Sequence, residues 1–412
     1  MTQTHTQIAV IGGGASGMTA AYTAARAGAQ VTLLERLPRV GKKLLLTGNG
    51  RCNLGNIHRE LNHYHGSLPQ AAQILAQTDP EAFFRRLGVC CRTDPEGRMY
   101  PMSNTAASVL DGLRFACDDQ GVQTCCDAQV TGMRRDKGGF LLTTPQGVLH
   151  AERVIFSAGG YAAPNCGTDG TAMALLRGLG HPVHTPQPAL CPIRTDPAAV
   201  KALKGIRVHA AVSAILGSKC LRQETGELQF ADGTLSGICV FQLSGLAAQY
   251  GSKLTVSVDL LPEWSREEAY STLSELHTKR RKLSLEELLT GMLPKRLGQV
   301  LLRRITDAPL TEPASCLSPG QLQQTAQLLK ALPFPVTGTA PWQAAQVTMG
   351  GIPGSALTDT LESRICPGLY ITGEATDLYG DCGGYNLMWA WASGICAGKA
   401  AAGSLHRKEC NP

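Results

Sequence analysis

The chain has 412 residues, of which 46 are glycine, a share well above the roughly 7% of an average protein. The glycines do not recur at every third position, which excludes a collagen-like chain, and a hydrophobic content of 43% excludes a mainly disordered one. A net charge of +6 is too small to indicate nucleic-acid binding by itself.

The first predicted elements form a nucleotide-binding unit. A strand at residues 8–11 leads into Gly12-Gly13-Gly14-Ala15-Ser16-Gly17, an alanine-rich helix follows, and a second strand at residues 31–34 ends on Glu35. In a G-x-G-x-x-G motif with these neighbours, the first glycine permits the turn, the second lets the backbone approach a pyrophosphate, and the third lets helix and strand pack closely. The opening N–H groups of the helix suit a diphosphate, and Glu35 suits ribose hydroxyls. A glycine turn without a ligand is the alternative.

The middle of the chain predicts an insertion. Helices are expected at residues 69–87 and 103–119. A small antiparallel meander with a returning strand is expected at residues 121–157. After Pro186 the pattern becomes β-like, with strands at residues 208–216, 237–243 and 254–260. Residues 262–332 then read as helices that begin after Ser265, Ser284 and Ser318. From Val347 the sequence is again rich in glycine, as in the first unit.

The end of the chain favours FAD over NAD in the predicted site. Residues 368–374 read as a strand that ends on Gly373-Glu374, and Gly383-Gly384-Tyr385-Asn386 opens a helix that continues to about Ala400. A flavin-binding fold uses such a segment for the ribityl chain, and the helix N-terminus would face flavin N1/O2, where negative charge accumulates on reduction. A buried amphipathic helix after a glycine turn is the alternative for this segment. Trp389 and Trp391 are expected to pack in the core.

Four segments resemble the flavoprotein family called HI0933-like. They are the glycine-rich loop of residues 41–54, the turn of residues 380–390, Ser157-Ala158-Gly159-Gly160, and Val347-Thr348-Met349-Gly350-Gly351-Ile352. The resemblance covers essentially the whole chain. It implies FAD and activities described as aminoacetone oxidation or, in a group from gut anaerobes, reduction of a steroid ring enone during bile-acid 7-dehydroxylation. Ala231-Asp232-Gly233 departs from the family's usual Phe-Thr-x-x-Gly, which puts substrate choice in doubt.

The predicted fold class is α/β: an FAD-binding Rossmann-like domain of the glutathione-reductase type, interrupted by an inserted domain with a β-barrel part and a helical part. The first part of the FAD domain is expected at residues 1–188. The β-rich subdomain, the helical subdomain, the closing part of the FAD domain and a tail follow at residues 189–262, 263–342, 343–404 and 405–412.

The predicted cofactor site combines these motifs. In the loop after Glu35, Arg51 could hold the pyrophosphate or stabilise reduced flavin, Asn53 could bond the isoalloxazine edge, and Cys52 is expected to be a packed thiol. The residues predicted to bind FAD are Gly12, Gly14, Ala15, Ser16, Gly17, Glu35, Arg36, Lys43, Gly48, Gly50, Arg51, Cys52, Asn53, Val130, Ala158, Gly159, Gly373, Glu374, Asp377, Gly384, Asn386 and Leu387.

Catalytic groups are less well defined by the sequence. Tyr385 and Asp381 are candidates for proton delivery because they lie beside the predicted flavin turn. His63 and His65 have no local carboxylate or thiol partner, so no metal site is predicted and the pair is expected to be superficial or already satisfied. The basic run at residues 279–282 has acidic neighbours and is expected to be a solvated helix turn.

The sequence therefore predicts an FAD-dependent oxidoreductase. No second G-x-G-x-x-G follows a strand, so NAD(P)H would dock transiently as the electron donor. We expect a reductase of a conjugated ketone on an apolar small molecule; the alternatives are an amine oxidase and an FAD-dependent tRNA-modifying protein. Fifteen cysteines without a Cys-x-x-Cys predict free thiols in a reducing cytoplasm. Neither a membrane span nor a cleavable leader is expected, and the oligomeric state stays open.

Overall fold

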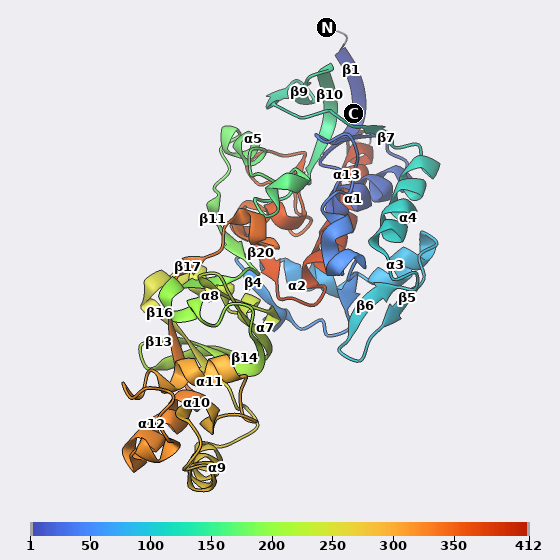
Figure 1. The fold of residues 1–412 in the computed structure, drawn as a ribbon. Helices are drawn as coiled ribbons and strands as arrows, with labels where there is room; N and C mark the ends of the chain where they lie inside the picture. Colours follow the sequence, from blue (N-terminus) through green and yellow to red (C-terminus); the bar gives the residue numbers. More distant parts are fainter. Residues whose placement is uncertain (1–2, 410–412) are drawn as a thin grey trace. The chain divides into compact units, whose positions relative to one another are not determined.

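The computed structural model describes residues 3–409, with the side chains of Gln3 and of residues 406–409 left out. The chain forms two compact units: residues 1–187 with 346–412, and residues 188–345. The first unit holds the glycine motifs, and the second unit is the insertion (Figure 1).

A seven-stranded sheet forms the centre of the first unit. Its order is β7-β2-β1-β10-β9-β8, with β19 also paired to β10. The strands are β1 (Gln3–Ile11), β2 (Val31–Leu34), β7 (Gln123–Cys125), β8 (Gly132–Asp136), β9 (Gly139–Thr144), β10 (Gly147–Phe156) and β19 (Leu369–Ile371). β7, β2, β1, β10 and β19 run parallel, whereas β8 and β9 are the antiparallel meander.

Apolar side chains on alternate faces of β1 explain why helices cover this sheet on both sides. Ile8 and Val10 pack into one core and Ala9 and Ile11 into another, and all four are buried. The helices of this unit are α1 (Ala15–Arg26), α2 (Ala71–Ala76), α3 (Pro80–Arg86), α4 (Ala106–Asp119), α5 (Met173–Gly178) and α13 (Tyr385–Glu409).

Two glycines of α13 let it pack against α1 at backbone distance (Figure 1). A Cβ at Gly394 would lie 2.6 Å from the carbonyl oxygen of Ser16, and one at Gly398 would lie 2.7 Å from that of Ala20. Any side chain at these positions would push the two helices apart. This packing brings the first and last motifs of the chain together.

Smaller sheets complete the first unit. They are β3 (Gly55–Asn56) with β6 (Arg98–Pro101) and β5 (Cys91–Thr93), β4 (Tyr64–Gly66) with β20 (Leu378–Gly380), and β11 (His184–Ala189) with β18 (Val347–Gly351). The helix expected at residues 69–87 is two helices, because Pro80 begins α3 and the Asp79 side chain caps it, accepting from the Ala82 N–H at 3.1 Å.

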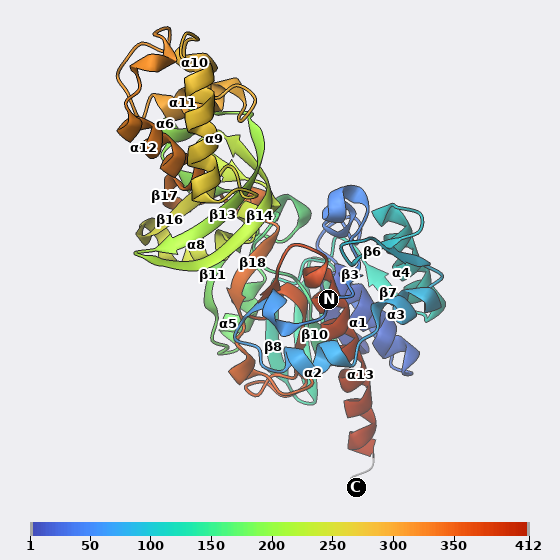
Figure 2. The ribbon, with the colours of Figure 1, turned by 90° about the horizontal axis from the view of Figure 1, so that it is seen from below.

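The second unit is a closed antiparallel barrel of order β12-β15-β14-β13-β16-β17 with helices packed on it (Figure 2). The strands are β12 (Ile193–Thr195), β13 (Arg207–Leu216), β14 (Lys219–Ala231), β15 (Thr234–Ser236), β16 (Leu254–Asp259) and β17 (Leu332–Thr339). The helices are α6 (Pro197–Lys201), α7 (Ile238–Phe241), α8 (Ser244–Tyr250), α9 (Arg266–Lys279), α10 (Leu285–Leu288), α11 (Lys295–Leu302) and α12 (Pro319–Lys330).

The sequence patterns of the second unit misled at two places. The strand expected at residues 237–243 is wrong, because Ile238–Phe241 is the short helix α7; a short apolar run does not distinguish the two. β14 was not expected, because charged side chains interrupt its pattern. The serine caps are confirmed: Ser265 and Ser318 each close a capping box, and α10 begins after Ser284.

Candidate functional site

The glycine motif lies between β1 and α1, and its three defining glycines meet different surroundings. Gly12 has φ +104°, and a Cβ there would lie 2.5 Å from the carbonyl oxygen of Ser157, at the end of β10. A Cβ at Gly17 would lie 1.8 Å from the carbonyl oxygen of Gly12. A Cβ at Gly14 meets no atom within 4 Å, so the backbone at the start of α1 faces open space. Two of the glycines therefore serve packing, and the third leaves room.

Glu35 lies at the end of β2 beside this turn. Its buried carboxylate accepts hydrogen bonds from the backbone N–H of Gly13 and of Leu37, both at 2.8 Å. Its carbonyl oxygen accepts from Ala128 at 2.8 Å, which brings the segment that contains the buried Val130 next to β2. These bonds fix the carboxylate next to the motif while leaving its other lone pairs available. The Arg36 side chain lies 2.8 Å from Asp169 instead.

The loop after Val40 has an unusual backbone. The 3-10 segment η1 (Leu44–Gly50) ends in left-handed residues, with φ +57° at Gly48, +55° at Asn49 and +81° at Gly50, and Cys52 follows with φ +59°. The Arg51 guanidinium lies over the Tyr100 ring, 4.8 Å from its centroid. Strain of this kind persists only where surrounding structure holds it, and it is common at ligand sites.

Cys52 is fully buried in this loop. Burial raises the pKa of its thiol to about 12, so the thiol stays protonated at neutral pH. A protonated thiol is a poor nucleophile. The structure agrees with a packed thiol rather than with a redox-active one.

Glu374 joins several segments of the predicted flavin site. Its carboxylate lies 2.6 Å from the Lys43 ammonium and accepts hydrogen bonds from the backbone and hydroxyl of Thr348, at 3.0 and 2.7 Å. The Thr348 hydroxyl oxygen also accepts from the Tyr161 N–H at 2.7 Å, just after the Ala158-Gly159 turn. Gly373, with φ +61°, leaves no space for a Cβ because the Ser16 hydroxyl would lie 2.6 Å from it. The predicted residues from four parts of the chain are therefore brought together.

The turn before α13 meets the η1 loop. A Cβ at Gly384 would lie 2.5 Å from the carbonyl oxygen of Gly55 and 2.6 Å from the side-chain oxygen of Asn53. The Asn386 side-chain oxygen accepts from the Gly380 N–H, and its amide nitrogen donates to the Gly380 carbonyl, both at 2.8 Å. This pair of hydrogen bonds closes the turn, and the next residue, Leu387, is partly buried. Asp377 accepts from the Ser67 hydroxyl at 2.6 Å and lies 2.7 Å from the His184 ring.

Two observations fit a bound FAD. The backbone at Gly14 faces open space where a pyrophosphate would approach, at the partly positive end of α1. The side-chain oxygen of Asn53 is buried without a hydrogen-bond partner. Buried polar atoms nearly always have partners, so a donor on a bound group would satisfy it. Both Gly14 and Asn53 are among the residues predicted to hold the cofactor.

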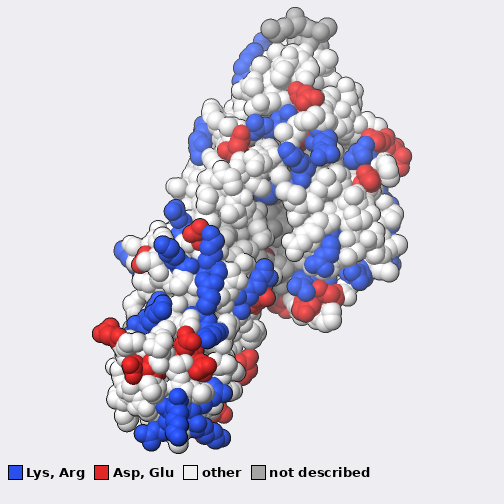
Figure 3. All heavy atoms as spheres, viewed as in Figure 1, with Lys and Arg blue, Asp and Glu red and all other residues white. Residues whose placement is uncertain are grey.

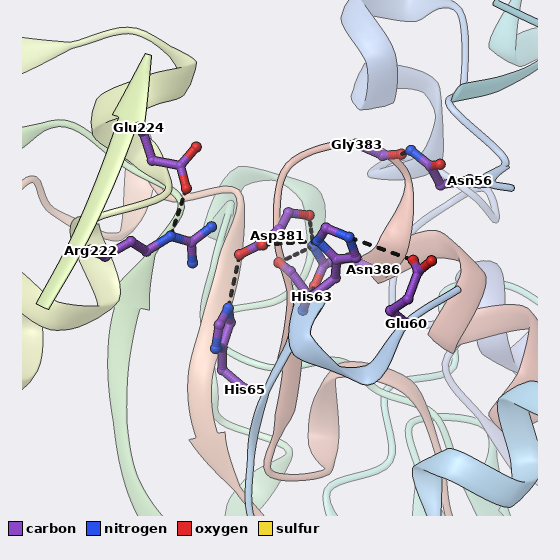
Figure 4. Close-up of polar contacts among 10 residues, drawn as sticks. Asn56, Glu60, His63, His65, Arg222, Glu224, Asp381, Gly383 and Asn386 are labelled. Atoms are coloured by element: carbon purple, nitrogen blue, oxygen red, sulfur yellow. Dashed lines mark hydrogen bonds and ion pairs between the residues drawn. The ribbon is translucent and has the colours of Figure 1, made fainter. Parts of the chain in front are cut away.

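A polar cluster that the sequence did not reveal lies beside this turn (Figure 4). Asp381 is 3% exposed, and its carboxylate oxygens lie 2.8 Å from Nε2 of His65 and 3.3 Å from Nδ1 of His63. The His63 ring stacks on Tyr385, with centroids 4.4 Å apart and planes at 17°. Burial, together with the carboxylates of Asp381 and Glu60, raises the pKa of Tyr385 to about 12.

Strand pairing creates this cluster. β4 and β20 are antiparallel with Tyr64 opposite Gly380, so the next residues, His63 and Asp381, become neighbours; the Asp381 N–H donates to the His63 carbonyl at 2.8 Å. The alternation His63-Tyr64-His65 was the available signal, because residues two apart share a face of a strand. Among residues 3–409 no three His, Cys, Asp or Glu side chains are arranged to hold a metal ion.

The family model of the HI0933-like protein Rossmann domain matches residues 6–400 of the chain. The chain belongs to this family. The HI0933-like chain is 38% identical over 406 residues to the 3-dehydro-bile acid delta(4,6)-reductase of Clostridium scindens, covering 96% of this chain and 99% of that protein. It is also 28% and 26% identical to the ribosomal RNA dihydrouridine synthases of Escherichia coli and Haemophilus influenzae, over 93% of this chain and 95% of each relative.

Solved structures share the fold of this HI0933-like protein. A quinol-fumarate reductase superposes with a TM-score of 0.51 at 14% identity, covering 98% of this chain and 72% of that one. The 3-ketosteroid delta1-dehydrogenase of Sterolibacterium denitrificans gives 0.50 at 13%, covering 97% and 100%. The expected family and fold class are confirmed, and the chain is an FAD-dependent oxidoreductase. Within the described part of the chain, no helix has the length and apolarity needed to cross a membrane.

Proposed function

We propose that the chain is an NAD(P)H-fed reductase that adds hydrogen across the conjugated double bond of an apolar ketone of the steroid or bile-acid type. One observation carries this proposal: the 38% identity to a named bile-acid delta(4,6)-reductase extends over nearly the full length of both chains. The resemblance to that group of family members was already present in the sequence motifs.

The residues of the first unit would divide the work of holding FAD. The N-terminus of α1 at Gly14 would receive the pyrophosphate, Glu35 would bond the ribose, and the turn of Gly383 and Gly384 would bring the start of α13 to the pyrimidine edge of the flavin. Bound FAD supplies hydride transfer at N5. The free N–H groups at the start of α13 would stabilise the negative charge that accompanies reduction.

An anaerobic titration tests the electron donor and the acceptor in turn. NADH or NADPH should bleach the yellow flavin of the purified holoprotein, and a 3-keto steroid with a conjugated double bond should restore the colour with saturated product. If neither nucleotide bleaches the flavin, the reductase proposal is wrong. Bleaching by aminoacetone, without enone turnover, would favour the amine-oxidase alternative.

A second candidate function has its own support, because two relatives are named ribosomal RNA dihydrouridine synthases. Their identity to this chain is lower than that of the bile-acid reductase, yet the reaction is related, since dihydrouridine also arises by hydrogenation of a conjugated double bond. Figure 3 shows Lys and Arg atoms gathered at the lower end of the inserted unit. Lys279 ends α9, and it is exposed together with Arg281 and Lys282; Glu275 pairs with Lys279.

A comparison of the two electron acceptors separates these functions. The reduced holoprotein is mixed with the steroid enone or with a ribosomal RNA transcript, and flavin reoxidation is followed. Reoxidation by RNA, together with binding that weakens steeply with salt, would replace the steroid proposal by the RNA one. We further propose that the protein works in the cytoplasm, because all fourteen described cysteines are free thiols.

A further inference from the structure

His63, His65 and Asp381, called here the histidine cluster, are titratable residues in mutual contact that have no part in the proposed binding of the cofactor. We propose that its two imidazoles, held by Asp381, are the proton source of the reduction. This inference rests on the proposed reductase function and adds to it the residues that balance hydride transfer with a proton.

The cluster has access to water and a fixed anchor at the same time. The Asp381 side chain is buried, whereas each imidazole keeps about a third of its surface exposed, at 32%. The Asn386 amide donates to the Asp381 carbonyl at 3.3 Å and so holds the loop that carries the carboxylate. Buried Asp381 can therefore position the rings while water restores the protons that they release.

The chemistry of the neighbours favours the imidazoles over the two groups expected from the sequence. Tyr385, with a pKa near 12, remains a neutral hydroxyl, and proton loss would place a third negative charge near Asp381 and Glu60. The two oxygens of the buried Asp381 carboxyl already face ring nitrogens of His65 and His63, at 2.8 and 3.3 Å, so this group is placed to position the rings. Imidazole is the side chain that ordinarily gains and loses a proton between pH 5 and 8.

Other titratable side chains of the same unit lie beside the two rings. Nε2 of His63 lies 3.9 Å from the Glu60 carboxylate, and the His65 ring lies 5.1 Å from the Tyr379 ring. The Tyr64 hydroxyl donates to the Tyr385 carbonyl at 3.2 Å, and burial raises its pKa well above the usual value. The Tyr64 hydroxyl therefore stays neutral at pH 7, and the carboxyl groups of Asp381 and Glu60 both lie beside the rings.

The position of the cluster connects it to the flavin turn. His63 stacks on Tyr385, which is the first residue of α13 and directly follows Gly383-Gly384. In the balanced step, the enone accepts hydride at its β-carbon and a proton at its α-carbon, so one π bond breaks and two C–H bonds form. The imidazolium loses that proton and becomes neutral, and water protonates it again. NAD(P)H is the reductant that the proposed function supplies.

The test separates the two half-reactions in single variants and in the double variant of His63→Gln and His65→Gln. Glutamine keeps a hydrogen-bond donor but carries no transferable proton, and His150→Gln in β10 is the matched control. Flavin content and the rate of reduction by NAD(P)H should stay within about twofold. The rate at which the enone reoxidises the flavin should fall about a hundredfold or more in the double variant, as for loss of a general acid.

Three further readouts distinguish proton donation from a structural role. The wild-type reoxidation rate should fall as pH rises through the imidazole range, whereas the double variant should be flat. Added imidazole should restore a His65→Gly variant in proportion to the imidazolium present. In the apoprotein, ¹⁵N NMR should show a protonated Nε2 on His65, and the hydrogen bond that it donates should be lost in Asp381→Ala.

The outcomes are separable. A wild-type protein that no enone reoxidises contradicts the proposed function. A wild type that reduces enone, with a double variant at the wild-type rate or with equal loss in both half-reactions, overturns the histidine proposal. So does an apoprotein in which Nε2 of His65 is unprotonated, because the ring would then offer Asp381 no proton across their 2.8 Å contact.

Discussion

Replacement of Gly14 by valine should separate cofactor binding from folding. Gly14 has φ −86° and ψ −167°, an extended conformation that any residue adopts, and its Cβ direction is free of protein atoms within 4 Å. The substitution places an apolar side chain at the N-cap of α1, which costs about 1 kcal/mol at most relative to glycine. The apoprotein should therefore melt within about 4 °C of the wild type.

The effect on FAD should be much larger. The valine side chain would fill the space in which the pyrophosphate is expected, and each lost hydrogen bond to a charged oxygen is worth about 1.5–3 kcal/mol. Loss of about 3 kcal/mol weakens binding roughly a hundredfold. Apoprotein titrated with FAD and followed by flavin fluorescence gives Kd directly, and differential scanning calorimetry gives the stability.

The control is Gly17→Ala, whose Cβ would lie 1.8 Å from the carbonyl oxygen of Gly12. This variant should lose stability even without FAD, because the clash lies within the protein. A Gly14→Val protein that is purified yellow, with normal FAD stoichiometry, would refute the placement of the pyrophosphate at this turn.

Three other predictions follow from buried or paired groups. The buried Cys52, with its raised pKa, should resist iodoacetamide at pH 7 while exposed Cys316 is alkylated, as peptide mass spectrometry would show; fast labelling of Cys52 would contradict its packing. Burial lowers the pKa of His181 from 6.5, so the unfolded state binds more protons than the folded one. The free energy of unfolding should therefore fall as pH drops below about 6.5. In urea titrations, His181→Gln should reduce this pH dependence by up to about 1.4 kcal/mol per pH unit. Glu374→Gln should lower the free energy of unfolding by about 1–3 kcal/mol, because the half-buried Lys43 ammonium loses its partner; an unchanged urea midpoint would show that solvent replaces the pair.

Local patterns were enough for much of the fold. The first strand, the glycine turn and α1 follow from an apolar run, a G-x-G-x-x-G and an alanine-rich segment, and the serine caps of α9 and α12 are read directly from residue types. The tryptophans of α13 are buried as expected, with Trp391 donating to the Leu54 carbonyl at 2.9 Å. Such features depend on neighbours within a few residues, so their signal is present in a short window.

The two elements of the second unit that the sequence did not predict, β14 and α7, depend on contacts with distant parts of the chain. β14 is a barrel strand in which charged side chains interrupt the apolar alternation, and α7 is an apolar run that is too short to show a helical period. In both, packing against distant strands selects the conformation rather than local propensity. The register of β14 on β13, with Gly226 opposite Ala210, is information that no window of sequence contains.

The sequence by itself determined the family, the flavin motifs and the segments that form the first unit, because each of these is encoded in the type and spacing of adjacent residues. Only the tertiary structure decided how the motifs combine. It paired Glu374 with Lys43 across 331 positions, and through the pairing of β4 with β20 it placed Asp381 between two histidines about 316 positions away. Long-range strand and helix pairing sets such contacts, and their strength comes from burial, which a linear sequence does not record.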